Sequence, residues 1–147
     1  MTMDRQEHRR ILSPGYAVGV TEAMIEDLVH AFYAKVRADA VLGPIFDGVI
    51  GDHWDEHLSK LCDFWSSVLL ASGRYSGAPM QVHAALPQIQ AEHFGQWLAL
   101  FKTTAAELWP KPAAELVCAR ADMIAKSFQY GIAASRGDLI DSRRQAR

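Results

Sequence analysis

The apolar residues of this chain recur at intervals of three and four over several long stretches, and this spacing constrains its fold most. In residues 21–39, TEAMIEDLVHAFYAKVRAD, they fall on one helical face: Met24, Ile25, Leu28, Val29, Phe32, Tyr33 and Val36. Similar spacing returns over residues 53–70, 91–109 and 113–134. No stretch alternates with period two over a useful length, so we predict four long helices, a short one and no strands. The predicted fold class is all-α, with helix packed on helix.

Glycine and proline mark where these helices should end. Gly43 and Pro44, in LGPIFDG, are expected to break the chain after the first long helix. The segment MQVHAAL, residues 80–86, lies between two such breaks and can hold barely two turns. We therefore divide the chain into a partly flexible N-terminal arm at 1–20, a helical domain at 21–134 and a disordered basic tail at 135–147.

Composition argues against several classes of protein. The 147 residues suffice for one core, and a formal net charge of −2 disfavours nucleic acid or an acidic membrane surface as partner. No apolar run approaches the roughly 20 residues that a membrane helix needs, and residues 1–20 lack the apolar core of a signal peptide. Cys62 and Cys118 fall inside apolar helical patterns rather than a CxxC pair. We therefore expect buried, reduced thiols and a cytoplasmic protein.

Two histidines four residues apart, in the stretch HWDEHLSKLCDFW, raise the question of a zinc site. The metalloprotease pattern H-E-x-x-H requires a glutamate directly after the first histidine, and Trp54 occupies that position here. No obvious third ligand lies nearby in the sequence. We therefore interpret His53 as a solvated residue of the first helical turn. His57, by contrast, shares the apolar face of Leu61.

Several segments each bring a polar-tipped side chain to an apolar face. Tyr33 lies on the face of the first long helix, and Trp97 follows His93 by four residues in the third. His83 belongs to the short segment, with Met80 one turn before it. Buried Tyr O–H and Trp N–H groups need partners, which separate local hydrogen bonds or a common ligand cavity could supply. With so few helices, a cavity flanked by aromatic residues and two histidines suggests haem, one histidine binding the iron.

Five stretches follow one another between residues 32 and 128: FYAKVRADAVLGPIF, WDEHLSKLCDFWSSVLL, YSGAPMQVHAALP, HFGQWLALF and RADMIAKSF. Each is a weak signal alone, but their order and spacing together are specific. The sequence thereby resembles the truncated haemoglobins, and specifically the third subgroup, because the glycine pairs typical of the other subgroups are missing. This resemblance implies a shortened globin fold, with helices stacked two on two, and haem b as the cofactor.

The resemblance also implies which residues surround the iron. His83 would be its proximal ligand, and Tyr33, His57 and Trp97 would form the distal pocket, on the side where a diatomic ligand binds. His93 is the main rival for the proximal role. If Trp97 is distal, however, His93 cannot easily reach the opposite face, so we expect it to be a surface residue at a helix start.

Residues farther from the iron are implied in the same way. Phe46 would pack against the porphyrin, and Tyr75 would be placed to hydrogen-bond a propionate, with help from Arg74. The remaining residues expected to line the haem or its immediate shell are Phe32, Leu61, Trp65, Met80, Phe94 and Ile124.

The implied pocket suits particular chemistry. Tyr33 and Trp97 can donate hydrogen bonds to a partly negative O2, and His57 can donate or swing away to admit ligand. We expect a monomeric haem protein that binds O2, NO and CO and is suited to tight O2 binding, redox chemistry or sensing rather than transport. The alternative is a haem-dependent peroxidase-like or NO-detoxifying enzyme, which would need a reductase because the chain has no GxGxxG motif. A haem-free helical interaction module is the third hypothesis.

Overall fold

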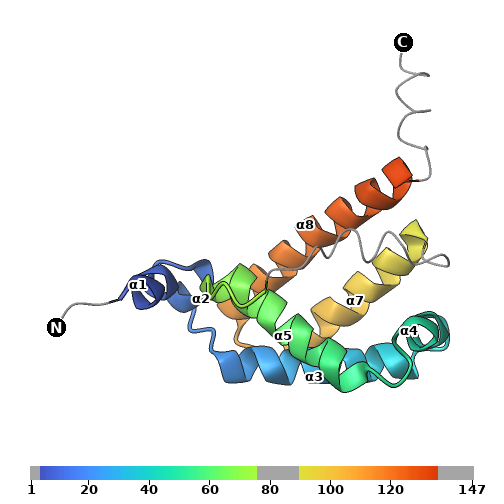
Figure 1. The fold of residues 1–147 in the computed structure, drawn as a ribbon, viewed down its shortest axis with the longest axis horizontal. Helices are drawn as coiled ribbons and strands as arrows, with labels where there is room; N and C mark the ends of the chain where they lie inside the picture. The colour runs from blue at the N-terminus through green and yellow to red at the C-terminus, as the bar shows by residue number, and fades with distance from the viewer. Residues whose placement is uncertain (1–3, 76–89, 136–147) are drawn as a thin grey trace, which may run out of the picture.

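A computed structural model describes residues 4–75 and 90–135, and these form seven helices without a strand (Figure 1). The helices are α1 (Arg5–Ile11), α2 (Pro14–Ala17), α3 (Glu22–Ala38), α4 (Leu42–Ile50), α5 (Trp54–Leu70), α7 (Ala91–Leu108) and α8 (Lys111–Ser135). The all-α prediction is confirmed, and the four long helices lie close to where the apolar spacing placed them. Within the described residues, no helix is long and apolar enough to cross a membrane.

Two pairs of long helices build the core. α3 packs on α5, α7 packs on α8, and α3 also contacts α7, so that the pairs are joined. Figure 1 shows α7 and α8 running alongside each other and across the direction of α3. The side chains with almost no exposure lie where these helices meet, and they include Leu28, Phe32, Leu69, Phe101 and Val117. This is the predicted two-on-two arrangement.

The first long helix, α3, ends at Ala38 as expected, but the segment LGPIFDG was expected to be non-helical and instead forms α4, so that part of the prediction was wrong. Pro44 is the third residue of α4 and lies in its first turn, where the missing N–H has no intrahelical acceptor to lose. The Asp39 carboxylate accepts hydrogen bonds from the two backbone N–H groups that lead into α4, each at 2.9 Å. Gly43 permits close packing, because a Cβ there would lie 2.5 Å from the Arg37 carbonyl oxygen.

The N-terminal arm, which was predicted only to be partly flexible, contains two short helices, α1 and α2. Asp4 caps α1 by accepting a hydrogen bond from the Glu7 N–H at 2.7 Å. α2 packs against α5 at Gly15, where an added Cβ would lie 2.6 Å from the Leu69 carbonyl oxygen. The arm therefore joins the helical domain through α2.

Candidate functional site

Three polar-tipped side chains from three helices meet in the interior. Tyr33 of α3 is only 3% exposed, and its ring centroid lies 6.0 Å from that of His57 on α5, with perpendicular planes. The indole of Trp97 on α7 lies beside the Tyr33 hydroxyl and acts on its pKa as a hydrogen-bond donor. Because the indole nitrogen can only donate, the Tyr33 hydroxyl oxygen is the acceptor side of this pair. The structure thus brings together the three side chains that the resemblance assigned to the distal pocket.

The Tyr33 hydroxyl keeps its proton over a wide pH range. Burial raises the pKa of Tyr33 to about 12, and the hydrogen bond from Trp97 offsets this rise only in part. The phenol is therefore neutral near pH 7. Its oxygen accepts from Trp97 while its O–H remains able to donate, which is what stabilising a polar ligand requires.

Aromatic rings enclose these polar tips. Phe32 meets Tyr33 edge-on at 4.7 Å between centroids and Trp97 at 5.4 Å. Phe101 stacks on Trp97 at 5.6 Å and on Trp65 at 5.2 Å. Rings packed in this way exclude water and lower the local dielectric, so each hydrogen bond inside is electrostatically stronger than in solvent.

Trp54 also belongs to this cluster, although the sequence did not single it out as a site residue. It is 5% exposed, and its ring lies 6.0 Å from Tyr33 and 5.8 Å from His57. Phe46 of α4 closes the same region at 6.3 Å from Tyr33. The available signal was the spacing of three between Trp54 and His57, which puts both on one face of a helix.

The other expected lining residues are more scattered. Leu61 is partly buried against the main core. Phe94 belongs to a second, smaller apolar cluster, and Ile124 packs against both clusters. Met80 and His83 lie outside the described residues, so the proximal side of the predicted site rests on the sequence.

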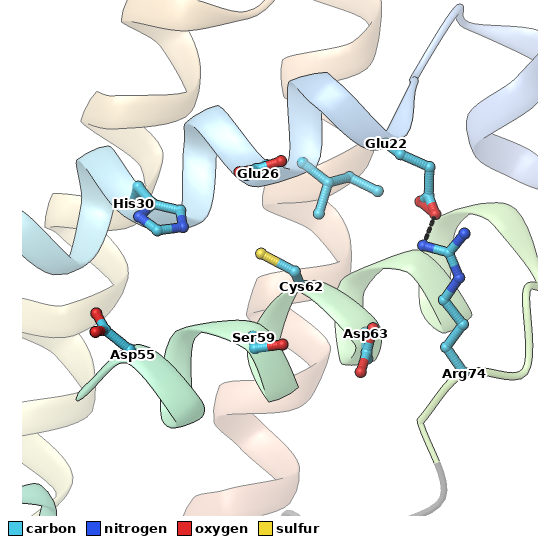
Figure 2. Close-up of a pocket in the computed structure, with 9 residues that line it drawn as sticks. Glu22, Glu26, His30, Asp55, Ser59, Cys62, Asp63 and Arg74 are labelled. Atoms are coloured by element: carbon cyan, nitrogen blue, oxygen red, sulfur yellow. Dashed lines mark ion pairs between the residues drawn. The ribbon is translucent and has the colours of Figure 1, made fainter. Parts of the chain in front are cut away.

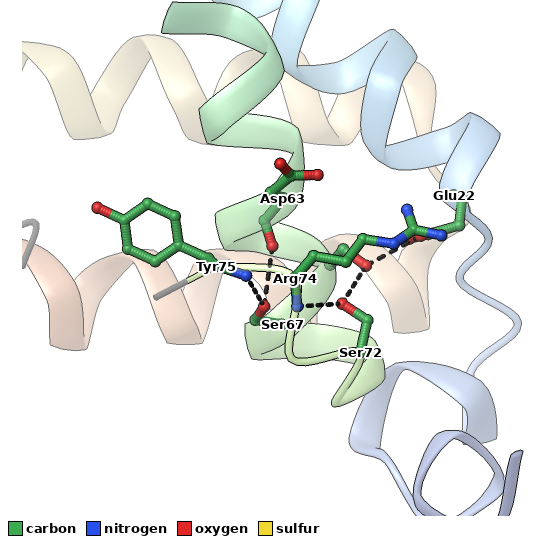
Figure 3. Close-up of polar contacts among 7 residues, drawn as sticks. Glu22, Asp63, Ser67, Ser72, Arg74 and Tyr75 are labelled. Atoms are coloured by element: carbon green, nitrogen blue, oxygen red, sulfur yellow. Dashed lines mark hydrogen bonds and ion pairs between the residues drawn. The ribbon is translucent and has the colours of Figure 1, made fainter. Parts of the chain in front are cut away.

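Tyr75 and Arg74 diverge after the end of α5 (Figure 3). The Tyr75 N–H donates to the Ser67 hydroxyl at 2.9 Å, and its ring packs edge-on against Phe64 at 5.3 Å. Arg74 points the other way and pairs with Glu22 at the start of α3. Arg74, which was expected to assist Tyr75, therefore ties α3 to the segment after α5.

His93 lies at a helix start as predicted, but it is not a surface residue. Its side chain is 12% exposed, and its Nδ1 accepts a hydrogen bond from the Gln90 N–H at 2.8 Å. This bond is one half of a capping box in which histidine stands where Glu or Gln is usual. The structure thus gives His93 a capping role.

A surface groove of about 290 Å³ runs between α3 and α5 (Figure 2). Burial raises the pKa of its Cys62 thiol to about 11, and nearby carboxylates, Glu26 foremost, add to the rise. A thiol in that state is a poor nucleophile at neutral pH. In the part of the chain that the structure describes, no three His, Cys, Asp or Glu side chains gather closely enough to hold a metal ion. The groove is lined by Glu22, Ile25, Glu26, His30, Asp55, Ser59, Cys62, Asp63 and Arg74.

Comparisons with known proteins agree with this architecture. The family model of the bacterial-like globins matches residues 16–129. A group 3 truncated haemoglobin of Campylobacter jejuni is 38% identical over 113 residues, covering 75% of this chain and 89% of that protein. This chain belongs to the group III truncated haemoglobins. The crystal structure of a group III truncated haemoglobin from Campylobacter jejuni matches this truncated haemoglobin with a TM-score of 0.73 and 37% identity, covering 77% of this chain and 91% of that one.

Membership of the globin family makes haem b the cofactor of this truncated haemoglobin, and binding of iron and oxygen follows from the family. The described residues fit such a group. The buried side chains of Tyr33 and Trp97 lie within a largely aromatic and aliphatic interior. Flat apolar walls with a few polar tips suit a porphyrin that carries a small polar ligand.

Proposed function

We propose that this truncated haemoglobin binds O2 tightly in a distal pocket formed by Tyr33, His57 and Trp97, for redox chemistry or sensing rather than transport. The observation that carries the proposal is the convergence of the Trp97 indole and the His57 ring on the buried Tyr33. When bound, haem supplies the iron to which a diatomic ligand attaches. The protein's own residues supply hydrogen bonds, exclude water and control access.

Tyr33 would be the main hydrogen-bond donor to the ligand. Its neutral phenol can donate, and Trp97 fixes the hydroxyl by donating to its oxygen. A ligand with partial negative charge is stabilised by such donors. A hydrogen bond to a charged group is worth about 1.5–3 kcal/mol, which corresponds to roughly a 10- to 100-fold slower dissociation.

His57 would control access to this pocket. Its side chain is only partly buried, and its ring stands perpendicular to both Tyr33 and, at 86°, Trp54. An imidazole in such a place can donate a hydrogen bond to the ligand in one tautomer, or turn toward solvent and open a path. Replacing it with leucine should change the rate of ligand entry, measured by flash photolysis of the CO complex.

His83 is proposed as the residue that would hold the iron, and Tyr75 as the donor to a propionate. Phe46 would pack against the porphyrin. His93 is disfavoured as the iron ligand because its Nδ1 already accepts the helix-capping hydrogen bond.

Absorption spectra of the ferric, dithionite-reduced and CO-bound protein test this assignment. His83→Ala should lose the spectrum typical of histidine-ligated haem, whereas His93→Ala should keep it and serve as the matched control. A normal spectrum in His83→Ala would overturn the proximal assignment. If the wild-type protein took up no hemin, the assignment of haem as its cofactor would be contradicted.

A second candidate is turnover by the same pocket, either peroxidase-like or through the reaction of O2 with NO. The imidazole of His57 beside the Tyr33 phenol favours it, because an imidazole can act as acid or base while the protonated phenol donates a hydrogen bond. This activity would require electrons from a separate reductase in the cytoplasm, where free thiols such as Cys62 and Cys118 persist. Consumption of peroxide or NO by the reduced protein, compared with His57→Leu, tests it.

A further inference from the structure

We propose that Asp47 and Arg37 clamp the indole of Trp54, and that this clamp positions His57 and Tyr33 in the distal pocket. The proposal deepens the proposed function and rests on it. The Trp54 clamp consists of three side chains from three helices: Arg37 near the end of α3, Asp47 in α4 and Trp54 at the start of α5.

The clamp holds the indole by its edge and by its face. The Trp54 Nε1–H donates to Asp47 Oδ1 at 2.8 Å. The Arg37 guanidinium carbon lies 4.6 Å from the centroid of the indole ring, in cation–π contact. The Arg37 Nε is also 3.6 Å from the same Asp47 oxygen, so the two residues that contact the indole form an ion pair with each other.

The placement of Asp47 is costly for α4 itself. This carboxylate lies in the last turn of the helix, where the macrodipole disfavours negative charge. The side chains of Asp47 and Arg37 are also about half exposed, so their ion pair contributes little stability. What the two residues share is the buried indole between them. Their arrangement therefore favours a role in fixing Trp54 over a role in stabilising α4.

Trp54 contacts two residues of the pocket, so its position affects theirs. Its ring meets His57 at 5.8 Å and an interplanar angle of 86°, and lies 6.0 Å from Tyr33. His57 is thus flanked by two rings, one of which the clamp holds. Any movement of the indole changes the space open to the imidazole, so Asp47 is a positioning residue that acts through Trp54.

The test compares four variants of the haem-loaded, CO-bound ferrous protein. Asp47→Leu removes the acceptor with little change in size, whereas Asp47→Asn keeps an oxygen that can accept from the indole. Trp54→Phe removes the donor. Trp109→Phe is the matched control, because Trp109 is similarly buried and donates its Nε1–H to the Met24 carbonyl, away from Tyr33 and His57. The readouts are the C–O stretching frequency, the CO rebinding rate and the ring-current shift of the His57 Hε1 proton.

Asp47→Leu and Trp54→Phe should shift the C–O band and the His57 resonance and change the rebinding rate by severalfold. Asp47→Asn and Trp109→Phe should keep wild-type values. Wild-type values in both Asp47→Leu and Trp54→Phe would overturn the clamp. Tyr33→Phe, measured alongside, separates the two proposals. A shifted C–O band in this variant would support the distal pocket even if the clamp proposal fails. An unshifted band would contradict the assignment of Tyr33 to the distal pocket.

Discussion

The interior where α3, α5 and α7 meet and the surface groove between α3 and α5 are built largely by the same two helices, but they differ in chemistry. In the interior, the Trp97 N–H faces the Tyr33 hydroxyl as a donor inside a shell of aromatic rings, and the Tyr33 O–H remains able to donate. In the groove, carboxylates from both helices face solvent around Cys62. Burial raises the pKa of Tyr33 and of Cys62 alike, yet only Tyr33 has a neighbour that donates to it. The interior therefore combines dry surroundings with a donor beside the Tyr33 hydroxyl, whereas the groove is open to solvent and lined mainly by carboxylates.

The largest difference between the interior and the groove should appear in how much a substitution lowers the free energy of unfolding. Phe32 is 1% exposed and contacts Tyr33, Trp97 and Phe101, so Phe32→Ala should lower the free energy of unfolding by about 3–5 kcal/mol. Ser59→Ala, in the exposed wall of the groove, should change it by less than about 0.5 kcal/mol. Urea unfolding measures both. Equal losses would show that the groove is packed as the interior is.

The second prediction uses the pH dependence of stability. The unfolded chain releases the Tyr33 proton near the ordinary pKa of 10.0, but the folded protein does so only at about 12. The folded state therefore binds more protons between these values, and stability present below pH 10 is lost as the pH rises through 12, by about 2–3 kcal/mol. Tyr33→Phe should remove this loss, as measured by urea unfolding at alkaline pH. A variant with an undiminished slope would contradict the raised pKa.

The third prediction concerns close helix approach beside the interior. Gly43→Ala places a Cβ against the Arg37 carbonyl oxygen and must push α4, which carries Phe46, away from α3. The expected loss is about 1–3 kcal/mol in thermal unfolding. Gly48→Ala, in the same helix but with no neighbouring atom within 4 Å, should instead raise stability by up to about 1 kcal/mol. A gain in stability in both variants would show that the close packing of α4 against α3 at Gly43 is not required.

The smallest effect is expected in the groove. Glu26 contributes to the raised pKa of Cys62 after burial itself, so Glu26→Gln should lower that pKa modestly and speed thiol alkylation a few-fold at pH 8. A Cys118→Ser background ensures that only Cys62 reacts, and Glu115→Gln, on the exposed face of α8, is the control. An unchanged alkylation rate would mean that the groove carboxylates do not act on Cys62.

The four long helices could be predicted because their apolar spacing is regular and their ends carry proline, glycine or capping residues. Tyr33, His57 and Trp97 could be singled out because each puts a polar tip on an apolar face, although only the family resemblance gave them roles. α4 was missed because a proline is harmless in a first helical turn, and the sequence does not say which turn it occupies.

The contacts of Trp54 and Arg74 could not be predicted for a different reason. Each depends on a partner from another segment: Trp54 meets Arg37 of α3 and Asp47 of α4, and Arg74 meets Glu22 of α3. Helical periodicity identifies the buried face of one helix. It does not identify which charged group of a neighbouring helix will reach that face, because this depends on how the helices cross.

The measurement that tests the central claim most directly is the O2 dissociation rate of the ferrous protein, followed by stopped flow in wild type, Tyr33→Phe and Glu26→Gln. If the interior at the junction of α3, α5 and α7 is the ligand site, Tyr33→Phe should release O2 at least about 10-fold faster, because a hydrogen bond to a partly charged ligand is lost. Glu26→Gln, in the groove, should match wild type. An unchanged rate in Tyr33→Phe would contradict the assignment of this interior as the distal pocket.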